Sequence, residues 1–300
     1  MPAIVHRFEL LEARARVFAR TLPRLKAPEV WGSERAWAAA RRLREVLPVL
    51  QLDGPMAEKL VERLRKMTRR LGAVRQTERL LALLDDFQAS NRGGRPVVAR
   101  LRNDVQRLVA VARADACRRR AGHDAQRLSD KLAEAVDVLR LEGRDRSKVR
   151  VMQWAVKARI SRRAADLAKA INAAGSVYLA RRLDTVHSAL RKLRYGAELA
   201  EEIVGHVGTA DVRALARMQT LLGRLDDLQA LIERIRQVQG SLATPDLKAW
   251  RELDAVVVAL ETRCRGLHAR YVRDRALLLA LCERLGSRAP SDGSARRKVS

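Results

Sequence analysis

Hydrophobic positions recur every three to four residues along almost the whole chain, which is the period of an α-helix. In "VHSALRKLRYGAELAEEI", residues 186–203, they form one continuous apolar stripe. No segment of convincing length alternates apolar and polar residues as a strand does. The pattern therefore predicts an all-α protein with roughly eight to ten helices.

Clusters of glycine, proline and aspartate interrupt this helical pattern, and residues of these types end helices or form turns. The interruptions lie at 23–28, 52–55, 91–96, 141–147, 175, 205–211, 240–246 and from 286 onwards.

Two sequence motifs recur at a nearly constant distance, which indicates an internal repeat. "RRLREVLPVL" begins at Arg41, and "RKLRYGAELA" begins at Arg191, 150 positions later. "RRLGAVRQTERLLALL" contains Gly72, and "TLLGRLDDLQALIERI" contains Gly223, 151 positions later. Two motifs that keep their register over this distance predict two related helical halves.

The repeat divides the chain into an N-terminal helical half, residues 1–150, a C-terminal helical half, residues 151–286, and a short tail, residues 287–300. The tail is polar and basic, and we predict that it is disordered because it has few apolar residues to bury. If the halves pack about a pseudo-twofold axis, equivalent side chains of both can face one shared groove or channel.

The charge of the chain is strongly unbalanced, with 61 Lys and Arg residues against 35 Asp and Glu and a formal net charge of +26. Such an excess attracts a polyanion, such as nucleic acid, an acidic membrane surface or a phosphate polymer. A coding bias would explain the use of arginine in place of lysine, but it would not explain the shortage of acidic residues.

Several features predict a cytoplasmic protein. No apolar run reaches the ~18 residues of a membrane span, and the first residues lack the features of a secretory signal. Cys117, Cys264 and Cys282 have no metal-ligand spacing and are expected to be reduced thiols in the core. We therefore expect no metal, no cofactor and no membrane partner.

A stripe of basic residues borders the apolar stripe of the 186–203 segment. Helical spacing places Arg191 and Arg194 on one side, with His187 a turn earlier, and Arg41 and Arg44 are their equivalents in the first half. Like charges at this spacing repel one another, and crowded arginines are costly unless an anion neutralises them. These four arginines are the main predicted contacts of a polyanion.

Further residues near the two motifs are weaker candidates for the same site. They are Arg42, Arg65, Arg69, His187, Lys192 and Arg217. For any single arginine, a solvated surface position is as reasonable as a ligand contact. We expect His187 to contact a phosphate or to link neighbours by hydrogen bonds, because no nucleophile lies near it in the sequence. Without a P-loop or an HExxH motif, no catalytic residue is predicted and the protein is not expected to be an enzyme.

A phosphate polymer suits this pattern better than a nucleic acid does. The planar fork of a guanidinium group matches phosphate oxygens, whereas the aromatic residues that stack on bases make up only 3% of the chain. We therefore predict noncatalytic binding of inorganic polyphosphate. The alternative is a basic, nucleoid-type protein that binds nucleic acid without sequence specificity, and some binding of this kind is expected at low salt in either case.

The segments "DTVHSALRKLRYGAELA" and "LLGRLDDLQAL", together with "RRLREVL" and "RRLGAVRQTERLL", resemble the CHAD family, whose name stands for conserved histidine α-helical domain. The resemblance extends from about residue 5 to about residue 285, and "RKLRYGAELA" is its most specific part. It implies two four-helix bundles related by internal symmetry around a basic central channel. It also implies binding of inorganic polyphosphate, often with association to intracellular polyphosphate granules, and no catalytic activity.

The chain departs from the family pattern at five positions. Asp184 stands at the position of the usual histidine, and His187 follows at a position that is usually basic. In the first half, Glu34 stands at the histidine position and Trp37 at that of an arginine. Gln76 replaces an expected aspartate. The arginines of both motifs are retained, so the chain resembles a divergent member of the family.

Overall fold

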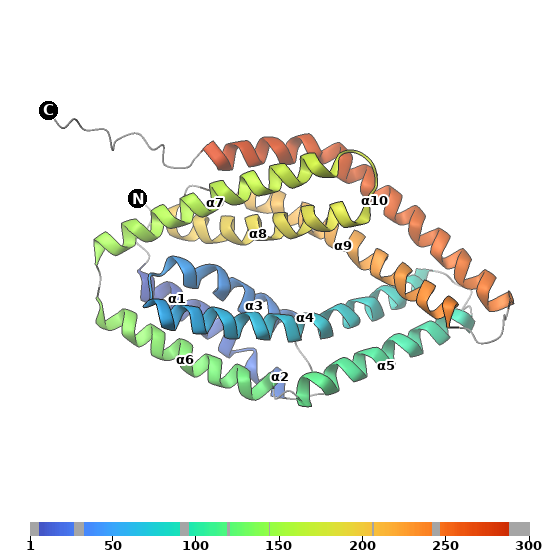
Figure 1. Ribbon diagram of the computed structural model, residues 1–300, viewed down its shortest axis with the longest axis horizontal. Coiled ribbons are helices and arrows are strands. Elements are labelled where there is room, and N and C mark those ends of the chain that lie inside the picture. Colours follow the sequence, from blue (N-terminus) through green and yellow to red (C-terminus); the bar gives the residue numbers. More distant parts are fainter. Residues whose placement is uncertain are drawn as a thin grey trace.

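The computed structural model describes residues 6–26, 33–90, 96–118, 121–143, 145–205, 207–241 and 247–287. Throughout these ranges the regular elements are helices, which confirms the predicted all-α class (Figure 1). In chain order they are α1 (Arg7–Ala19), α2 (Leu22–Lys26), α3 (Ser33–Val46), the short 3-10 helix η2 (Leu47–Val49), α4 (Gly54–Ser90), α5 (Pro96–Arg118), α6 (Ala121–Leu141), α7 (Arg146–Ala174), α8 (Ala180–Val204), α9 (Thr209–Gly240) and α10 (Leu247–Ser287). The predicted tail, 287–300, lies outside the described residues except for its first residue, where α10 ends.

Local signals in the sequence determine several helix ends. The side chain of Asp145 accepts a hydrogen bond from the backbone N–H of Ser147 at 2.8 Å, which caps the start of α7. Gly175 and Gly205 follow α7 and α8 with φ angles of 66° and 64°, a region that glycine adopts without steric cost. These ends lie where the interruptions of the helical pattern predicted them.

The helices of each half pack mainly against one another. In the first half α1 contacts α3 and α6, and α4 contacts α3, α5 and α6. In the second half α7, α8, α9 and α10 each contact two neighbours in turn, which closes a bundle of four helices. Contacts of α3 with α8 and of α4 with α9 join the halves. The predicted boundary at residue 150 falls in the first turns of α7.

Two clusters of buried apolar side chains form the core, and each contains residues of both halves. The larger cluster lies among α1, α3, α6, α7 and α8, the first parts of α4 and α9, and the end of α10. The second joins the ends of α4 and α9 to α5 and the start of α10, at the right-hand end of Figure 1. The repeat did not predict this second cluster. Because both clusters are shared, packing fixes α3 and α4 relative to α8 and α9.

A half-buried ion pair holds α3 against α7. Arg163 of α7 pairs with Glu45 of α3, and the two side chains are only 11% and 13% exposed. Arg163 also donates a hydrogen bond to the carbonyl oxygen of Lys192 of α8 at 2.8 Å. A Cβ atom on Gly196 would lie 2.9 Å from Nη1 of Arg163, closer than side chains normally approach. Glycine at this position therefore leaves room for a guanidinium group that connects three helices.

The cysteines and the apolar character of the helices bear on the features from which a cytoplasmic protein was predicted. Cys264 and Cys282 are buried, as expected, but the prediction of a core position was wrong for Cys117, which is exposed because Ala116 takes the inward position on α5. Within the described ranges, no helix combines the length and the apolar character that a membrane span requires.

Substituting Gly196 by alanine should destabilise the fold. The added methyl group displaces the Arg163 guanidinium and weakens its half-buried pair with Glu45. This cost exceeds the helix-propensity gain of alanine, and we expect a net loss of about 1 kcal/mol in the free energy of unfolding. Gly266 is the matched control, because it lies exposed inside α10 with open space around its Cβ position. Gly266→Ala should gain about 0.5–1 kcal/mol from helix propensity. Urea unfolding measures both changes, and equal effects of the two substitutions would contradict the close approach at Gly196.

Candidate polyanion site

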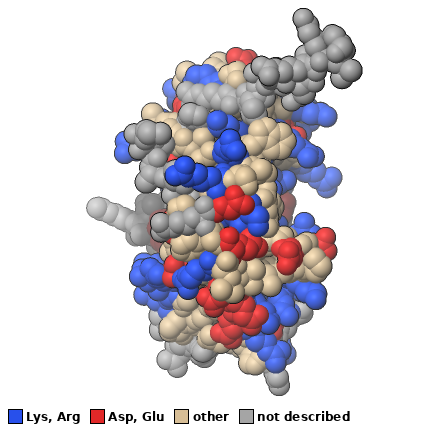
Figure 2. All heavy atoms as spheres, turned by 90° about the vertical axis from the view of Figure 1, so that its left-hand side faces the viewer, with Lys and Arg blue, Asp and Glu red and all other residues tan. Residues whose placement is uncertain are grey.

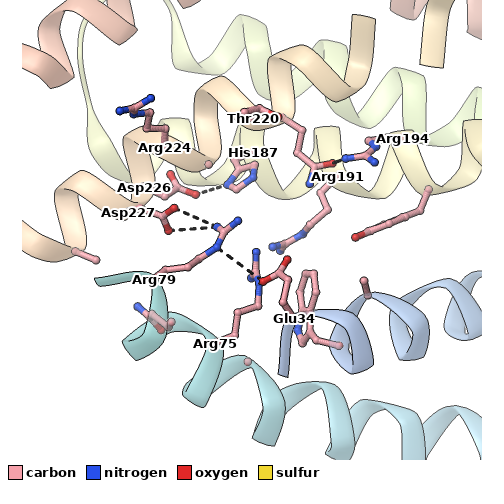
Figure 3. Close-up of a pocket in the computed structure, with 18 of the residues that line it drawn as sticks. Glu34, Arg75, Arg79, His187, Arg191, Arg194, Thr220, Arg224, Asp226 and Asp227 are labelled. Atoms are coloured by element: carbon pink, nitrogen blue, oxygen red, sulfur yellow. Dashed lines mark hydrogen bonds and ion pairs between the residues drawn. The ribbon is translucent and has the colours of Figure 1, made fainter. Parts of the chain in front are cut away.

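A cavity of about 570 Å³ lies between the two halves of the chain. Its walls are formed by α3 and α4 of the first half and by α8 and α9 of the second (Figure 3). Six arginines and three acidic residues are among the side chains that line it: Arg42, Arg75, Arg79, Arg191, Arg194, Arg224, Glu34, Asp226 and Asp227. The excess of arginine favours an anionic occupant.

Two aromatic rings support the crowded arginines. The guanidinium carbon of Arg75 lies 4.1 Å from the centroid of the Trp37 ring, that of Arg41 at 5.1 Å and that of Arg191 at 5.7 Å. The Tyr195 ring has three guanidinium carbons at 5.8–6.0 Å, those of Arg41, Arg42 and Arg194. A cation over an aromatic face is attracted by the ring quadrupole. The two rings therefore offset part of the repulsion among five arginines.

Arg41 of α3 and Arg191 of α8 come from opposite halves, and neither has a carboxylate oxygen within 4.0 Å among the described residues. Burial, followed by the charge of Arg191, lowers the pKa of Arg41 to about 10. Burial is also the largest cause that lowers the pKa of Arg191, whose buried Nε atom has no hydrogen-bond partner. Both groups stay protonated at neutral pH. Arg191 lines the cavity and Arg41 lies beside it, so two half-buried positive charges without a carboxylate partner meet there.

Two other arginines of the cavity are paired with its own carboxylates. Arg75 forms an ion pair with Glu34, and Nη1 of Arg79 lies 3.2 and 3.3 Å from the two carboxylate oxygens of Asp227 (Figure 3). Arg79 also approaches Glu34 at 3.9 Å. These contacts connect α3, α4 and α9 around the cavity, so part of its positive charge is neutralised from within.

Glu198 of α8 neutralises a further pair of arginines. Its carboxylate accepts hydrogen bonds from Nε of Arg194 at 2.9 Å and from Nε of Arg42 at 3.3 Å. The Glu198 side chain is 19% exposed, and it joins α3 to α8 beside the Tyr195 ring. One carboxylate thus serves two guanidinium groups, which leaves this part of the cavity wall positively charged.

Equivalent positions of the proposed repeat pack alike on glycine. A Cβ atom on Gly72 would lie 3.6 Å from Nε1 of Trp37, and a Cβ atom on Gly223 would lie 3.6 Å from Cε1 of His187. Trp37 and His187 are 150 positions apart, and the two glycines 151. A flat ring therefore lies against a glycine of the neighbouring helix at both places.

Arg44 of α3 and Arg194 of α8, at equivalent positions of the proposed repeat, also make matching contacts. Arg44 donates a hydrogen bond to Oγ1 of Thr68, and Arg194 donates one to Oε1 of Gln219, both at 3.2 Å. The donors are 150 positions apart and the acceptors 151, the same offsets as in the sequence motifs.

An acidic cluster adjoins the arginines on the α8–α9 side. Nδ1 of His187 is hydrogen-bonded to Asp226, and Asp184 lies a turn earlier on α8 in contact with the same aspartate (Figure 3 shows the first of these contacts). Burial, then the charge of Asp226, raises the pKa of Asp184 to about 6, and Glu233 adds to the effect. His187 is thus placed between the arginine row and a group of carboxylates.

Five of the predicted contact residues meet at the cavity. Four of them line it, namely Arg42, His187, Arg191 and Arg194. The fifth, Arg41, lies against the rings of Trp37 and Tyr195, between α3 and α8. The two halves therefore contribute predicted residues to one place.

The other predicted contact residues lie outside the cavity lining. Arg44 is half-buried, and burial is the largest cause that lowers its pKa, with nearby Arg65 and Arg69 contributing. Arg65 and Arg69 themselves are exposed on α4, and Lys192 is exposed on α8. Arg217 lines a separate hollow of about 320 Å³ between α9 and α10. Arg217 is therefore the predicted contact that lines a different hollow.

Sequence reasoning did not select three arginines of the cavity, Arg75, Arg79 and Arg224. Arg75 and Arg79 lie one and two turns after Gly72 on α4, and Arg224 directly follows Gly223 on α9. Their position after the glycine of each motif is the signal that would have identified them, because that glycine marks where the helix approaches the ring of the neighbouring helix.

Basic and acidic side chains are mixed on the surface at one end of the molecule. Figure 2 shows the end that lies on the left in Figure 1, and acidic side chains are gathered on it between basic ones. In the described parts of the chain, no group of three or more His, Cys, Asp and Glu side chains is arranged to hold a metal ion. Arginine is the most frequent charged residue in the lining of the cavity.

These features define an all-α protein in which α3, α4, α8 and α9 line an arginine-rich cavity. The family model of the CHAD domain matches residues 9–236, and the chain belongs to the CHAD family. CHAD domains are generally noncatalytic binding domains, and membership is consistent with polyphosphate-related binding in general.

The fold is similar to a crystal structure of the CHAD domain from the plant Ricinus communis. The TM-score is 0.61 at 19% sequence identity, and the similarity covers 97% of this chain and 95% of that chain. It therefore includes most of α10, the whole of which lies beyond the residues that the family model matches. A comparison with curated proteins found no match.

The acidic cluster should make stability depend on pH through Asp184. Because its pKa of about 6 in the folded chain lies above the ordinary value of 3.8, the folded state takes up this proton first. The destabilising effect of the carboxylate is therefore present above the folded pKa and is lost as the pH falls through that value towards 3.8. We expect Asp184→Asn to raise the free energy of unfolding at neutral pH because it removes this carboxylate. The gain should be only about 1 kcal/mol, because Asp184 is exposed and solvent screens its charge, and near pH 4 the substitution should have no effect. Thermal unfolding at the two pH values checks this, and an equal gain at both would contradict it.

Proposed function

We propose that this protein binds inorganic polyphosphate in the cavity between its halves, without catalysing a reaction. The observation that carries the proposal is the pair Arg41 and Arg191, two half-buried guanidinium groups from opposite halves that have no carboxylate partner among the described residues. A bound polyanion would supply the missing counter-charge. Location in the cytoplasm, with association to polyphosphate granules, belongs to the same proposal.

The spacing of the arginines supports a polymer in preference to a single anion. The cavity draws its guanidinium groups from α3, α4, α8 and α9. Each group presents a fork of donors that can hold two phosphate oxygens. Successive phosphates of one chain can occupy neighbouring arginines, and every contact after the first forms within the same complex at high effective concentration. A linear chain of identical anionic units therefore matches this wall better than one small ion.

The aromatic residues of the cavity support phosphate over nucleic acid. Trp37 and Tyr195 are each only 6% exposed, and guanidinium groups lie over their rings. A base that stacked on either ring would have to displace those arginines, whereas single-stranded nucleic acids are usually held by accessible aromatic faces. Binding of nucleic acid to this chain would then rest on net charge alone.

Replacing the two half-buried arginines without a carboxylate partner, Arg41 and Arg191, should abolish retention of polyphosphate. Each charge-assisted hydrogen bond contributes about 1.5–3 kcal/mol, so we expect Arg41→Gln with Arg191→Gln to weaken binding of long-chain polyphosphate by at least ~100-fold. The thermal midpoint of unfolding should stay the same or rise, because the substitutions remove two crowded, desolvated charges. Fluorescence anisotropy with labelled polyphosphate at physiological salt measures the binding.

The matched control is Arg63→Gln with Arg181→Gln. These arginines lie on α4 and α8, are exposed and are outside the cavity lining, so the control removes the same charge. It should weaken binding no more than about threefold through the lower net charge. Equal losses for the two double variants would show that net charge alone attracts the ligand, as in the nucleic-acid alternative, and would overturn the proposal.

A further inference from the structure

The arginines of the cavity differ in what an incoming anion must displace. Arg41 and Arg191 have no carboxylate within 4.0 Å among the described residues, whereas Arg75 is paired with Glu34, and Arg79 with Asp227. An anion that binds the first two gains contacts at no cost in existing ion pairs. An anion that binds Arg75 and Arg79 must first separate them from carboxylates that already belong to the chain.

The two carboxylates are placed so that they can be exchanged. Glu34 is 56% exposed and lies in the first turn of α3, so its side chain can turn from Arg75 into solvent without moving the helix. Asp227 is 24% exposed, and burial is the largest cause that raises its pKa above the ordinary value. The carboxylate of Asp227 is therefore only partly compensated by Arg79. Among the described residues, Arg75 and Arg79 are the partners through which the two carboxylates are bonded to another helix.

We propose that Glu34 and Asp227 act as internal counter-anions, which occupy Arg75 and Arg79 in the free protein and which polyphosphate displaces when it binds. This inference rests on the proposed function. In this role the two acidic residues limit the affinity of the cavity for anions. A ligand with many charges can still bind, because it replaces the internal ion pairs by several phosphate contacts. An isolated phosphate replaces one carboxylate by one anion with little net gain, because a charge-assisted hydrogen bond is lost for each one formed.

Removing either carboxylate should therefore tighten binding. We expect Glu34→Gln and Asp227→Asn each to increase the affinity for long-chain polyphosphate by about 3–10-fold at physiological salt. The control is Glu62→Gln, which removes an equal charge from α4 at a residue that pairs with exposed Lys66 at 3.7 Å, outside the cavity. The control should change the affinity less than twofold. Titration calorimetry on the full chain gives the dissociation constants.

A double-mutant cycle separates displacement from a general effect of charge. If Glu34 competes with the ligand for Arg75, the gain from Glu34→Gln disappears when Arg75 is already replaced by glutamine. The cycle of Asp227 with Arg79 should behave in the same way. Full additivity in both cycles, or a gain with Glu62→Gln as large as with the cavity variants, would overturn the inference.

The same titrations distinguish failure of this inference from failure of the proposed function. If the wild-type chain binds polyphosphate and Arg41→Gln with Arg191→Gln abolishes binding, the proposed function is supported whatever the acidic variants do. Unchanged or weaker binding by Glu34→Gln and Asp227→Asn would then overturn the internal counter-anions alone. Absence of polyphosphate binding by the wild-type chain would overturn both.

Discussion

Repulsion between like-charged guanidinium groups in a half-buried cavity is the constraint on which the rest of the site depends. Aromatic rings, internal carboxylates and solvent offset it to different degrees. Trp37 and Tyr195 attract the cations by their faces, and Glu198 serves two arginines at once. Arg41 and Arg191 have no carboxylate within 4.0 Å among the described residues, and burial lowers the pKa of both although Glu45 and Asp226 act in the opposite direction from a greater distance. In the free chain the positive charge of the site is therefore only partly compensated, and a bound anion would lower its electrostatic free energy.

Such an arrangement persists only if the surrounding helices are held firmly by other interactions. Two apolar clusters supply most of this, and both include residues of the two halves, so the cavity walls are fixed by packing on either side. The half-buried pair of Arg163 and Glu45 adds a polar contact between α3 and α7, and Gly196 of α8 leaves the space that this contact needs. The stability that the crowded arginines cost is thus compensated outside the cavity.

Spacing along a single helix was enough to predict most of the fold and half of the site. It determines which residues share a face, so the stripe containing Arg191 and the helix ends near Gly175 and Gly205 could be predicted. It does not determine which neighbour that face meets. Arg217 points towards α10, whereas Arg75, which was not selected, lines the cavity. The division between α5 and α6 likewise has no strong stop signal, and α6 packs back against α1.

The cavity is electrostatically asymmetric at positions that the predicted repeat would make equivalent. By the offset of 151, Arg75 of the first half corresponds to Asp226 of the second. Arg75 makes an ion pair with Glu34, but Asp226 lies against Asp184, the residue equivalent to Glu34, and burial together with this neighbour raises the pKa of Asp184 to about 6. One side therefore presents a neutralised arginine and the other a pair of acids. A phosphate chain would meet half-buried arginines without a carboxylate partner where Arg41 of α3 and Arg191 of α8 approach the same aromatic ring, and the exposed Arg224 of α9 lines the cavity beside the pair of acids. If the proposed function is correct, Arg41 and Arg191 are then the residues from which a bound anion gains most, because their charges are half-buried and lack a carboxylate partner among the described residues.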